Sequence, residues 1–328
     1  MSPNTTSTAG FSSIIQYSVF LRRIFEYNVK RRVLPFPSIF CIQTINLCNG
    51  SCIMCPLVQN SKKESMVMSN RLFEKIIKEI SQEQLKFTYI NLFLQNEPLM
   101  DKDIFKKIGL IKKISGGKIK TGLVTNGTIF SNEKIKELEK SKIDEIIFSL
   151  DALTEETYTK IRPGLNFKDV LKNIENVIDS GYDKYLAVKF VLQKDNILEF
   201  DDFKKFWKKK GIPIQISYLN NRSGDLNTYD DLCLKKRDFP ILVNLTNYIG
   251  RKMFRGCSTP LITFNILYNG DVILCCDDYS KKMILGNVND SSIKEIWNSK
   301  KYQKIREILY SREYKKIPVC CTCSKVTS

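Results

Sequence analysis

Three cysteines lie close together in the segment Cys48-Asn49-Gly50-Ser51-Cys52-Ile53-Met54-Cys55-Pro56. This CxxxCxxC spacing lets three thiolates reach one metal centre and leaves its fourth position open. Zinc sites built from cysteine are usually closed by four protein ligands. An iron-sulfur cluster with one iron free of protein ligands therefore fits the spacing better. Three structural thiols, or a zinc knuckle, are the alternative interpretations.

A second group of cysteines follows in the last quarter of the chain. Four of its members could close a further metal site: Cys257, Cys275, Cys320 and Cys323. The segment 262–275 is typical of a β-hairpin with a two-residue turn at Asn269-Gly270. Ser292 and Glu295 form a capping box that starts a helix through about Leu309. Four thiolates held by a hairpin and a helix suit a zinc ribbon or a second cluster.

The composition is that of a globular protein of one large domain, or of a large and a small one. Of the 328 residues 43% are hydrophobic, and no run approaches the ~18 apolar residues that would span a bilayer. Residues 1–10 lack the features of a secretory signal, so we expect a cytoplasmic protein whose cysteines are ligands or free thiols. The chain contains no histidine, so proton transfer must fall to Lys, Asp, Glu, Tyr or Cys.

The chain is basic, with 52 Lys and Arg against 35 Asp and Glu and a formal net charge of +17. In residues 200–210 the lysines alternate with an aromatic stripe at helical spacing, which indicates solvated helix faces. We therefore expect no nucleic-acid partner. Residues 11–32 predict a basic amphipathic helix, for which packing against the open side or end of the fold is favoured over peripheral contact with an anionic membrane.

From residue 39 onward, apolar runs typical of strands alternate with amphipathic helical patterns. We expect strands at 39–46, 88–95, 119–125, 145–150, 185–192 and 213–219. We expect helices at 69–83, with Ser69 as N-cap, and at 101–115, 131–142, 166–180 and 198–210. This alternation predicts an α/β fold with a parallel sheet. It does not by itself separate an open doubly wound sheet from a partial barrel.

Polar motifs follow several of these strands, at the edge where parallel strands build their sites. They are Gln95-Asn96-Glu97-Pro98, Thr125-Asn126-Gly127, Ser149-Leu150-Asp151 and, further on, Arg162. Each motif alone is equally explained as a turn or a solvated strand end. Their order, downstream of CxxxCxxC and each closing a strand-helix unit, makes the combination specific.

Together these motifs resemble the radical S-adenosylmethionine (SAM) superfamily. The resemblance implies a partial (β/α)6 TIM-like barrel over about residues 39–220, in which Cys48, Cys52 and Cys55 bind a 4Fe-4S cluster whose open iron chelates SAM. It further implies that SAM is held by Gln95, Asn96, Glu97, Thr125, Asn126, Ser149, Asp151 and Arg162. The chain departs from the family in one place, because Gln95 and Asn96 replace two glycines.

The tail resembles the Twitch domain, the shortened form of the SPASM extension of radical SAM enzymes, through Gly270-Asp271-Val272-Ile273-Leu274-Cys275 and Cys320-Cys321-Thr322-Cys323. A second 4Fe-4S cluster on Cys257, Cys275, Cys320 and Cys323 is implied. Neighbouring Cys276 and Cys321 leave the ligand choice open by one residue, and the register of GxVxxC and CxxC favours Cys275, Cys320 and Cys323. The expected domains are an N-terminal extension (1–38), a radical SAM core (39–245) and the cluster-binding tail (246–328).

The resemblance implies an enzyme that cleaves SAM reductively and abstracts hydrogen from its substrate, with an electron donor such as flavodoxin or ferredoxin. The layout is similar to members that oxidise an aminocyclitol, so we expect oxidation or epimerisation of a hydroxylated small molecule such as a sugar. A maturase of ribosomal peptides and a non-catalytic iron-sulfur or zinc adaptor are the alternatives. Cys233, after the sixth strand, is the candidate hydrogen donor of an epimerase, and oxidation is the favoured outcome. Cys41 is expected at the barrel end away from the chemistry.

Overall fold

The computed structural model describes residues 33–57, 64–83, 88–235, 257 and 259–327. The amphipathic helix predicted for residues 11–32 lies outside the described residues. Among the described helices, none is long and apolar enough to cross a membrane.

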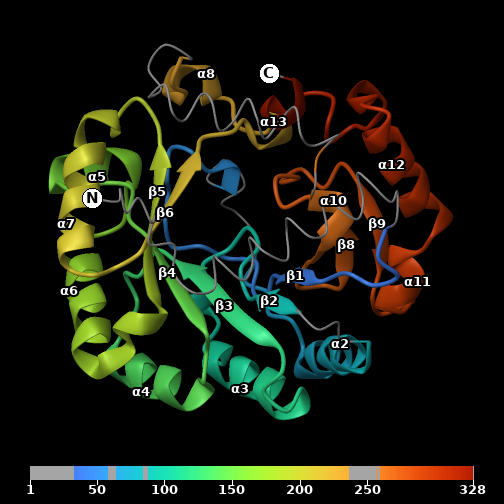
Figure 1. Cartoon of the computed structure of the whole chain (residues 1–328), viewed down its shortest axis with the longest axis horizontal. Coiled ribbons are helices and arrows are strands. Elements are labelled where there is room, and N and C mark those ends of the chain that lie inside the picture. Colours follow the sequence, from blue (N-terminus) through green and yellow to red (C-terminus); the bar gives the residue numbers. More distant parts are fainter. Residues whose placement is uncertain (1–32, 58–63, 84–87, 236–256, 258, 328) are drawn as a thin grey trace, which may run out of the picture.

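One sheet of nine strands organises the chain, in the order β6-β5-β4-β3-β2-β1-β7-β8-β9 (Figure 1). The six strands predicted for the barrel are parallel: β1 (Ile39–Ile42), β2 (Tyr89–Asn91), β3 (Lys120–Thr125), β4 (Glu145–Ser149), β5 (Leu186–Leu192) and β6 (Ile214–Tyr218). β1 and β2 end earlier than predicted, because the residues after them leave the sheet: Ile45 bridges to Val67, and Gln95 adopts a left-handed φ of 55°. The predicted α/β fold is confirmed.

Helices on the outer face cover the parallel strands: α2 (Asn70–Gln82), α3 (Ile104–Ile114), α4 (Asn132–Ser141), α5 (Glu155–Ile161), α6 (Phe167–Val177) and α7 (Phe200–Lys209). The hydroxyl group of Ser69 accepts a hydrogen bond from the Leu72 amide and caps α2, as predicted. The short helix α5 was not predicted, and it fills the connection between β4 and α6. In Figure 1, α4, α6 and α7 lie along the outside of the strands.

Alternation along β5 shows how the sheet separates a packed core from a lumen. Val188 and Phe190 are fully buried in the main core under the helices. Ala187 points the other way, into a small cluster with Val124 and Ile147, as period-2 alternation requires. Strand residues that point the same way as Ala187 therefore line the inside of the partial barrel, which we call the lumen.

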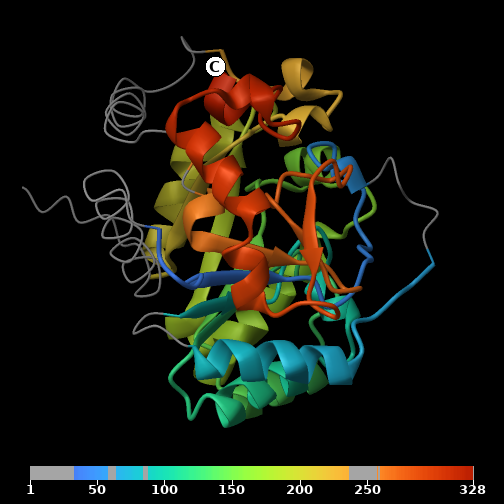
Figure 2. The ribbon, with the colours of Figure 1, turned by 90° about the vertical axis from the view of Figure 1, so that its right-hand side faces the viewer.

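The C-terminal part continues the same sheet. α10 (Thr259–Ile262) leads into β7 (Thr263–Ile266), which pairs parallel with β1, and β8 (Asp271–Ile273) and β9 (Ile284–Asn287) add antiparallel. α11 (Ile293–Trp297), α12 (Lys300–Tyr310) and α13 (Ser324–Thr327) complete this part, and α8 (Tyr229–Leu232) follows β6. Figure 2 shows α11 and the C-terminal strands next to β1 and above α2.

Two local predictions for this part need correction. The hairpin does not turn on two residues: Gly270 donates its amide to the Leu267 carbonyl, and Leu267 donates to Asp271, so three residues form the loop. Gly270 closes it with a φ of 91°, which a side chain would disfavour. The capping box of Ser292 is present, but its helix ends at Trp297, and Ser299 caps a separate helix α12.

Candidate active site

The first cysteine segment lies between β1 and α2 and is fastened to the loop after α5. The Ile53 amide donates to the Ile161 carbonyl at 3.0 Å, and the Ser51 amide donates to the Pro163 carbonyl at 3.2 Å. Asn49 accepts a hydrogen bond of 2.7 Å from the Asn126 side chain, which joins the segment to the end of β3. The cysteine segment is thereby held by the strand-end motifs that were predicted to surround it.

The three thiols of this segment, on Cys48, Cys52 and Cys55, are partly buried and interact with one another. The pKa of the Cys48 thiol is raised to about 12, mainly by burial and further by Glu97, Cys52 and Cys55. A hydrogen bond from the Gly50 amide lowers this pKa in part. Sulfurs on one zinc ion lie at most about 4.6 Å apart, twice the Zn–S bond length. Among described residues, only Cys275, Cys276 and Asp277 bring three ligand atoms within 4.8 Å of one another. The three thiols of the first set are therefore packed less tightly than the ligands of one zinc ion.

Glu97 ties the ends of β2 and β3 together beside these thiols. Its buried carboxylate accepts hydrogen bonds from the Thr125 hydroxyl (2.6 Å), the Asn126 amide (2.7 Å) and the Leu99 amide (3.0 Å). Burial raises the pKa of Glu97, and these donors only partly oppose the rise. Three of the predicted SAM contacts therefore share one network.

Asp151 and Arg162 form a buried ion pair next to the same thiols. The Asp151 carboxylate accepts from Nε and from an Nη atom of Arg162 at 3.1 and 2.5 Å, and its other oxygen accepts from the Val191 amide at 2.7 Å. A second Nη atom of Arg162 donates to the Cys52 sulfur at 3.5 Å. Ser149, at the end of β4, is half-buried and lies opposite Lys189 of β5. Asp151 of the predicted fourth-strand motif and Arg162 thus meet beside Cys52.

Gln95 and Asn96 are placed differently from the glycines of the family. The Gln95 side chain donates to the carbonyls of Cys276 (2.9 Å) and Asp278 (3.0 Å) and accepts from Lys281. The Asn96 side chain accepts from the Leu94 amide at 2.9 Å. The side chain of Gln95 is therefore committed to the C-terminal loop, while its left-handed backbone retains the conformation that glycine favours.

The second thiol set comes together from three separate segments. Cys275 follows β8, Cys320 and Cys323 lie between α12 and α13, and Cys257 precedes α10. Burial raises the pKa of Cys320 to about 12, and Cys257 and Cys323 raise it further. Burial likewise raises the pKa of Cys323, with smaller contributions that include Cys257. Two buried and two half-buried thiols that come together in this way suit a closed metal or cluster site.

The two cysteines adjacent to this set are placed differently from each other. Cys321 is exposed, and its thiol donates to the Pro318 carbonyl at 3.2 Å. Cys276 packs with Cys41 and Leu94 on the lumen face. The exposure of Cys321 favours Cys320 as the ligand, whereas the sulfur atoms of Cys275 and Cys276 lie within 4.8 Å of each other, so either could serve. The structure also corrects the expected position of Cys41, which lies on the lumen face of β1 beside Cys276.

Cys233 lies at the barrel mouth, at the end of α8. Its thiol is 3.9 Å from the Asp230 carbonyl, and it packs against the small cluster that contains Met54 and Val191. The structure therefore places Cys233 half-buried, next to the segment that carries the first thiol set.

Sequence reasoning missed three residues near the site. Tyr279 reaches Cys55 of the first thiol set, where the thiol donates to its hydroxyl at 4.0 Å. Arg222 donates to Asp277 at 2.8 Å. Lys189 stands in the otherwise apolar strand Leu186–Leu192, and a lone lysine in such a run was the available signal.

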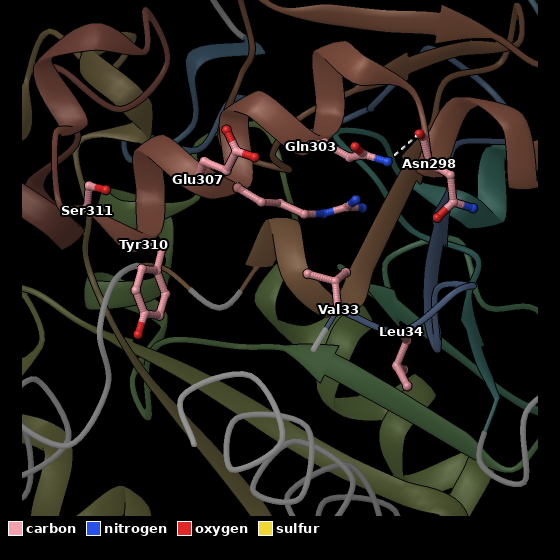
Figure 3. Close-up of a pocket in the computed structure, with 8 residues that line it drawn as sticks. Val33, Leu34, Asn298, Gln303, Glu307, Tyr310 and Ser311 are labelled. Carbon is pink, nitrogen blue, oxygen red and sulfur yellow. Dashed lines mark hydrogen bonds between the residues drawn. The ribbon is translucent and has the colours of Figure 1, made fainter. Parts of the chain in front are cut away.

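A pocket of about 500 Å³ lies apart from this site (Figure 3). It is lined by Val33 and Leu34 and by residues of α12 that include Glu307 and Tyr310. Its lining contains no cysteine and none of the predicted site residues. We assign it no part in the chemistry.

Comparison with known proteins gives matches for both halves of the chain. Residues 42–206 match the family model of the radical SAM superfamily, and residues 257–324 match that of the SPASM iron-sulfur cluster-binding domain. A GTP 3′,8-cyclase of Clostridium botulinum is 29% identical over 179 residues, which cover 54% of each protein. The chain thus spans about half the length of that relative. The SAM-dependent 2-deoxy-scyllo-inosamine dehydrogenase of Niallia circulans is 21% identical over 287 residues, which cover 87% of this chain and 92% of that protein.

Solved structures share the fold across both parts. BtrN in complex with AdoMet and 2-DOIA superimposes with a TM-score of 0.59 at 19% identity, covering 88% of this chain and 93% of BtrN. Streptococcus suis SuiB bound to the precursor peptide SuiA gives 0.68 at 17% identity, covering 99% and 78%. These likenesses confirm the partial barrel. The predicted cofactors, SAM and iron-sulfur clusters, agree with the two family matches and with the thiol sets described above. Because the first match spans half of the chain, the protein belongs to the radical SAM superfamily, with a SPASM iron-sulfur cluster-binding domain after the barrel.

Proposed function

We propose that the protein is a radical SAM oxidoreductase that oxidises a hydroxylated small molecule such as a sugar or aminocyclitol. The observation that carries the proposal is the match to the inosamine dehydrogenase, because it runs through the barrel and the cluster-binding tail together. The match to the GTP cyclase covers only about half of the chain. The proposed extents are 39–245 for the barrel domain and 246–328 for the tail.

The cofactors are assigned to the two thiol sets and the strand-end network. Cys48, Cys52 and Cys55 would hold the first 4Fe-4S cluster, and Cys257, Cys275, Cys320 and Cys323 the second. Glu97, Thr125, Asn126, Ser149, Asp151 and Arg162 would orient SAM, with Gln95 and Asn96 contributing through their backbone. When bound, SAM and the first cluster would supply a 5′-deoxyadenosyl radical, which takes a hydrogen atom from a substrate carbon. The second cluster would accept one electron.

The protein's own residues bind, orient and shield the reactants. Arg162 offers a charged, buried donor group that is fixed by Asp151 and suits a carboxylate. The carboxylate of Glu97 is buried, and an ammonium group of the ligand beside it would offset the cost of burying this negative charge. An alcohol that is oxidised to a carbonyl also loses one proton, which a lumen side chain or solvent must take. The electron donor would be a flavodoxin or ferredoxin in the cytoplasm.

A peptide substrate is the second candidate. The fold is similar to that of SuiB bound to its precursor peptide, and this likeness extends over 99% of the chain. We rank it second because no third set of cysteines is left for a further cluster. Seven cysteines account for the two proposed clusters, and the remaining four lie at separate places in the structure or adjoin proposed ligands.

The test is substrate-dependent formation of 5′-deoxyadenosine by anaerobically reconstituted, dithionite-reduced protein. Sugars and aminocyclitols are compared with short peptides, and the variant with Ala at Cys48, Cys52 and Cys55 is the control. We expect stimulation by a hydroxylated small molecule together with a carbonyl product. Stimulation by peptides alone would replace the proposal with a maturase. Tightly bound zinc without SAM cleavage would indicate an adaptor.

A further inference from the structure

Lys189 is a cation inside the barrel. It lies between Ala187 and Val191 on the lumen face of β5, opposite Ser149 of β4 and Gln215 of β6. It is half-buried, and its ammonium group has no hydrogen-bond or ion-pair partner among the described residues. A partly buried ammonium group without an anion costs stability, which indicates a group whose partner arrives with a ligand.

Arg222 reaches the same space from the turn after β6. Its backbone and that of Ser223 are left-handed, with φ of 49° and 57°, a conformation held by contacts of this turn with the tail. One Nη atom of Arg222 donates to Asp277 at 2.8 Å, while its Nε–H is buried and donates to no described atom. Burial lowers the pKa of the Lys189 ammonium group, and Arg222 is a charged neighbour that lowers this pKa further.

The carboxylates near these cations are already paired. Asp151 is bound by Arg162, and Asp277 is shared by Arg222 and Lys325, the latter at 2.5 Å. Neither is therefore free to neutralise Lys189. Among the described residues, Lys189 therefore has no ion-pair partner in the lumen beside the candidate SAM pocket.

Two buried side-chain oxygen atoms on the lumen face of the sheet accept no hydrogen bond from the described residues. Asn91 of β2 and Asn265 of β7 flank Cys41 in the sheet, on the lumen face. The side-chain oxygen of each is buried and accepts no hydrogen bond within the described residues. Buried polar atoms are normally satisfied, so these two unpaired acceptors on one wall, together with the unpaired Nε–H of Arg222, point to a polar ligand. Cys276 packs in the same small cluster as Cys41 and interacts electrostatically with Lys189.

We propose that the lumen binds a hydroxylated substrate that also bears an anionic group, a carboxylate or a phosphate, held by Lys189 and Arg222. Asn91 and Asn265 would accept hydrogen bonds from its hydroxyl groups. The inference rests on the proposed function and narrows its substrate class. SAM itself has a carboxylate, so the same cations could serve the cofactor, and the test must distinguish the two sources.

The probe is selenate, an anion that anomalous diffraction locates. Crystals of the cluster-reconstituted, SAM-bound protein are soaked in selenate, and the same is done for Lys189→Met and for Lys205→Met, which removes an exposed lysine of α7. We expect a selenate peak between Nζ of Lys189 and Nε of Arg222 in the wild type and in Lys205→Met, and none in Lys189→Met. Lys189→Arg, which keeps the charge, should retain the peak.

Affinities measured in solution distinguish the sources of the anion. The dissociation constant for inorganic phosphate should rise roughly tenfold or more in Lys189→Met, because a charge-assisted contact is lost, while that for SAM stays unchanged. A SAM carboxylate seated on Lys189 and Arg222, or a parallel loss of SAM affinity, would assign the pair to the cofactor and overturn the proposal. A missing selenate peak in the wild type would also overturn the proposal. None of these results depends on which compound stimulates SAM cleavage, so the proposed function is tested independently of this anion site.

Discussion

The hydroxyl oxygen of Tyr279 lies 4.0 Å from the sulfur of Cys55, although 224 positions separate the two residues in sequence. Tyr279 belongs to the loop that follows Cys275, and Cys55 belongs to the first thiol set. The contact therefore joins the loop after Cys275 to the first thiol set.

This contact predicts an effect on reduction potential. A hydroxyl group that donates to a cluster-bound thiolate favours the reduced state, since hydrogen bonds to the sulfurs set the potential. Tyr279→Phe should lower the potential of the first cluster by roughly 40 mV, the equivalent of one hydrogen bond of about 1 kcal/mol. An EPR-monitored redox titration measures it, with Tyr268→Phe as a control. Equal potentials in both variants would show that the hydroxyl does not reach the cluster ligand.

Arg162→Ala should weaken SAM binding. Loss of a charge-assisted bond to a carboxylate costs about 1.5 to 3 kcal/mol, or roughly tenfold or more in affinity. Equilibrium dialysis with labelled SAM measures the change. The matched control is Lys160→Ala, which removes an exposed cation two residues away that is paired with Asp195. If both variants bind SAM like the wild type, Arg162 does not belong to the pocket.

The strand-end motifs were predictable because parallel strands bring their carboxyl ends to one edge. Glu97, Thr125 and Asn126 meet there as expected. The parallel pairing of β7 with β1 was not predictable, since no local pattern specifies which strand a distant segment will join. The same holds for Tyr279 and Arg222, whose positions depend on how the tail packs on the barrel. Gln95 was recognised by its motif, yet its contacts to the Cys276 and Asp278 carbonyls require that packing.

Iron content separates the two thiol sets. Reconstituted protein should bind about eight irons, as two 4Fe-4S clusters. Replacing Cys48, Cys52 and Cys55 together by Ala should halve both iron and sulfide. Replacing Cys321, which is exposed, by Ala should change neither. About four irons together with tightly held zinc would contradict the assignment of the tail.

Asp144→Asn should lower stability in a pH-dependent way. Burial raises the pKa of Asp144, but Lys112 and Lys120 outweigh it and hold the pKa below its usual value. A carboxyl with a depressed folded-state pKa stabilises the protein above its unfolded pKa of about 3.9, and this stability is lost as the pH falls through the folded value. The variant should therefore be less stable at pH 7, and the difference should shrink below about pH 4. Urea unfolding across this range measures it, and a constant difference would exclude the ion pairs as its cause.

The fate of the substrate radical distinguishes oxidation from epimerisation. An epimerase needs a hydrogen donor that quenches the radical from the opposite face, whereas a dehydrogenase loses a proton and passes an electron to the second cluster. Cys233 is half-buried and packs in an apolar cluster that contains Met54, which is common for a structural thiol. We expect product formed in deuterated water to carry no solvent deuterium at carbon, and Cys233→Ala to keep turnover. Deuterium at the reacting carbon, with loss of product but not of 5′-deoxyadenosine in Cys233→Ala, would instead make Cys233 the hydrogen donor of an epimerase.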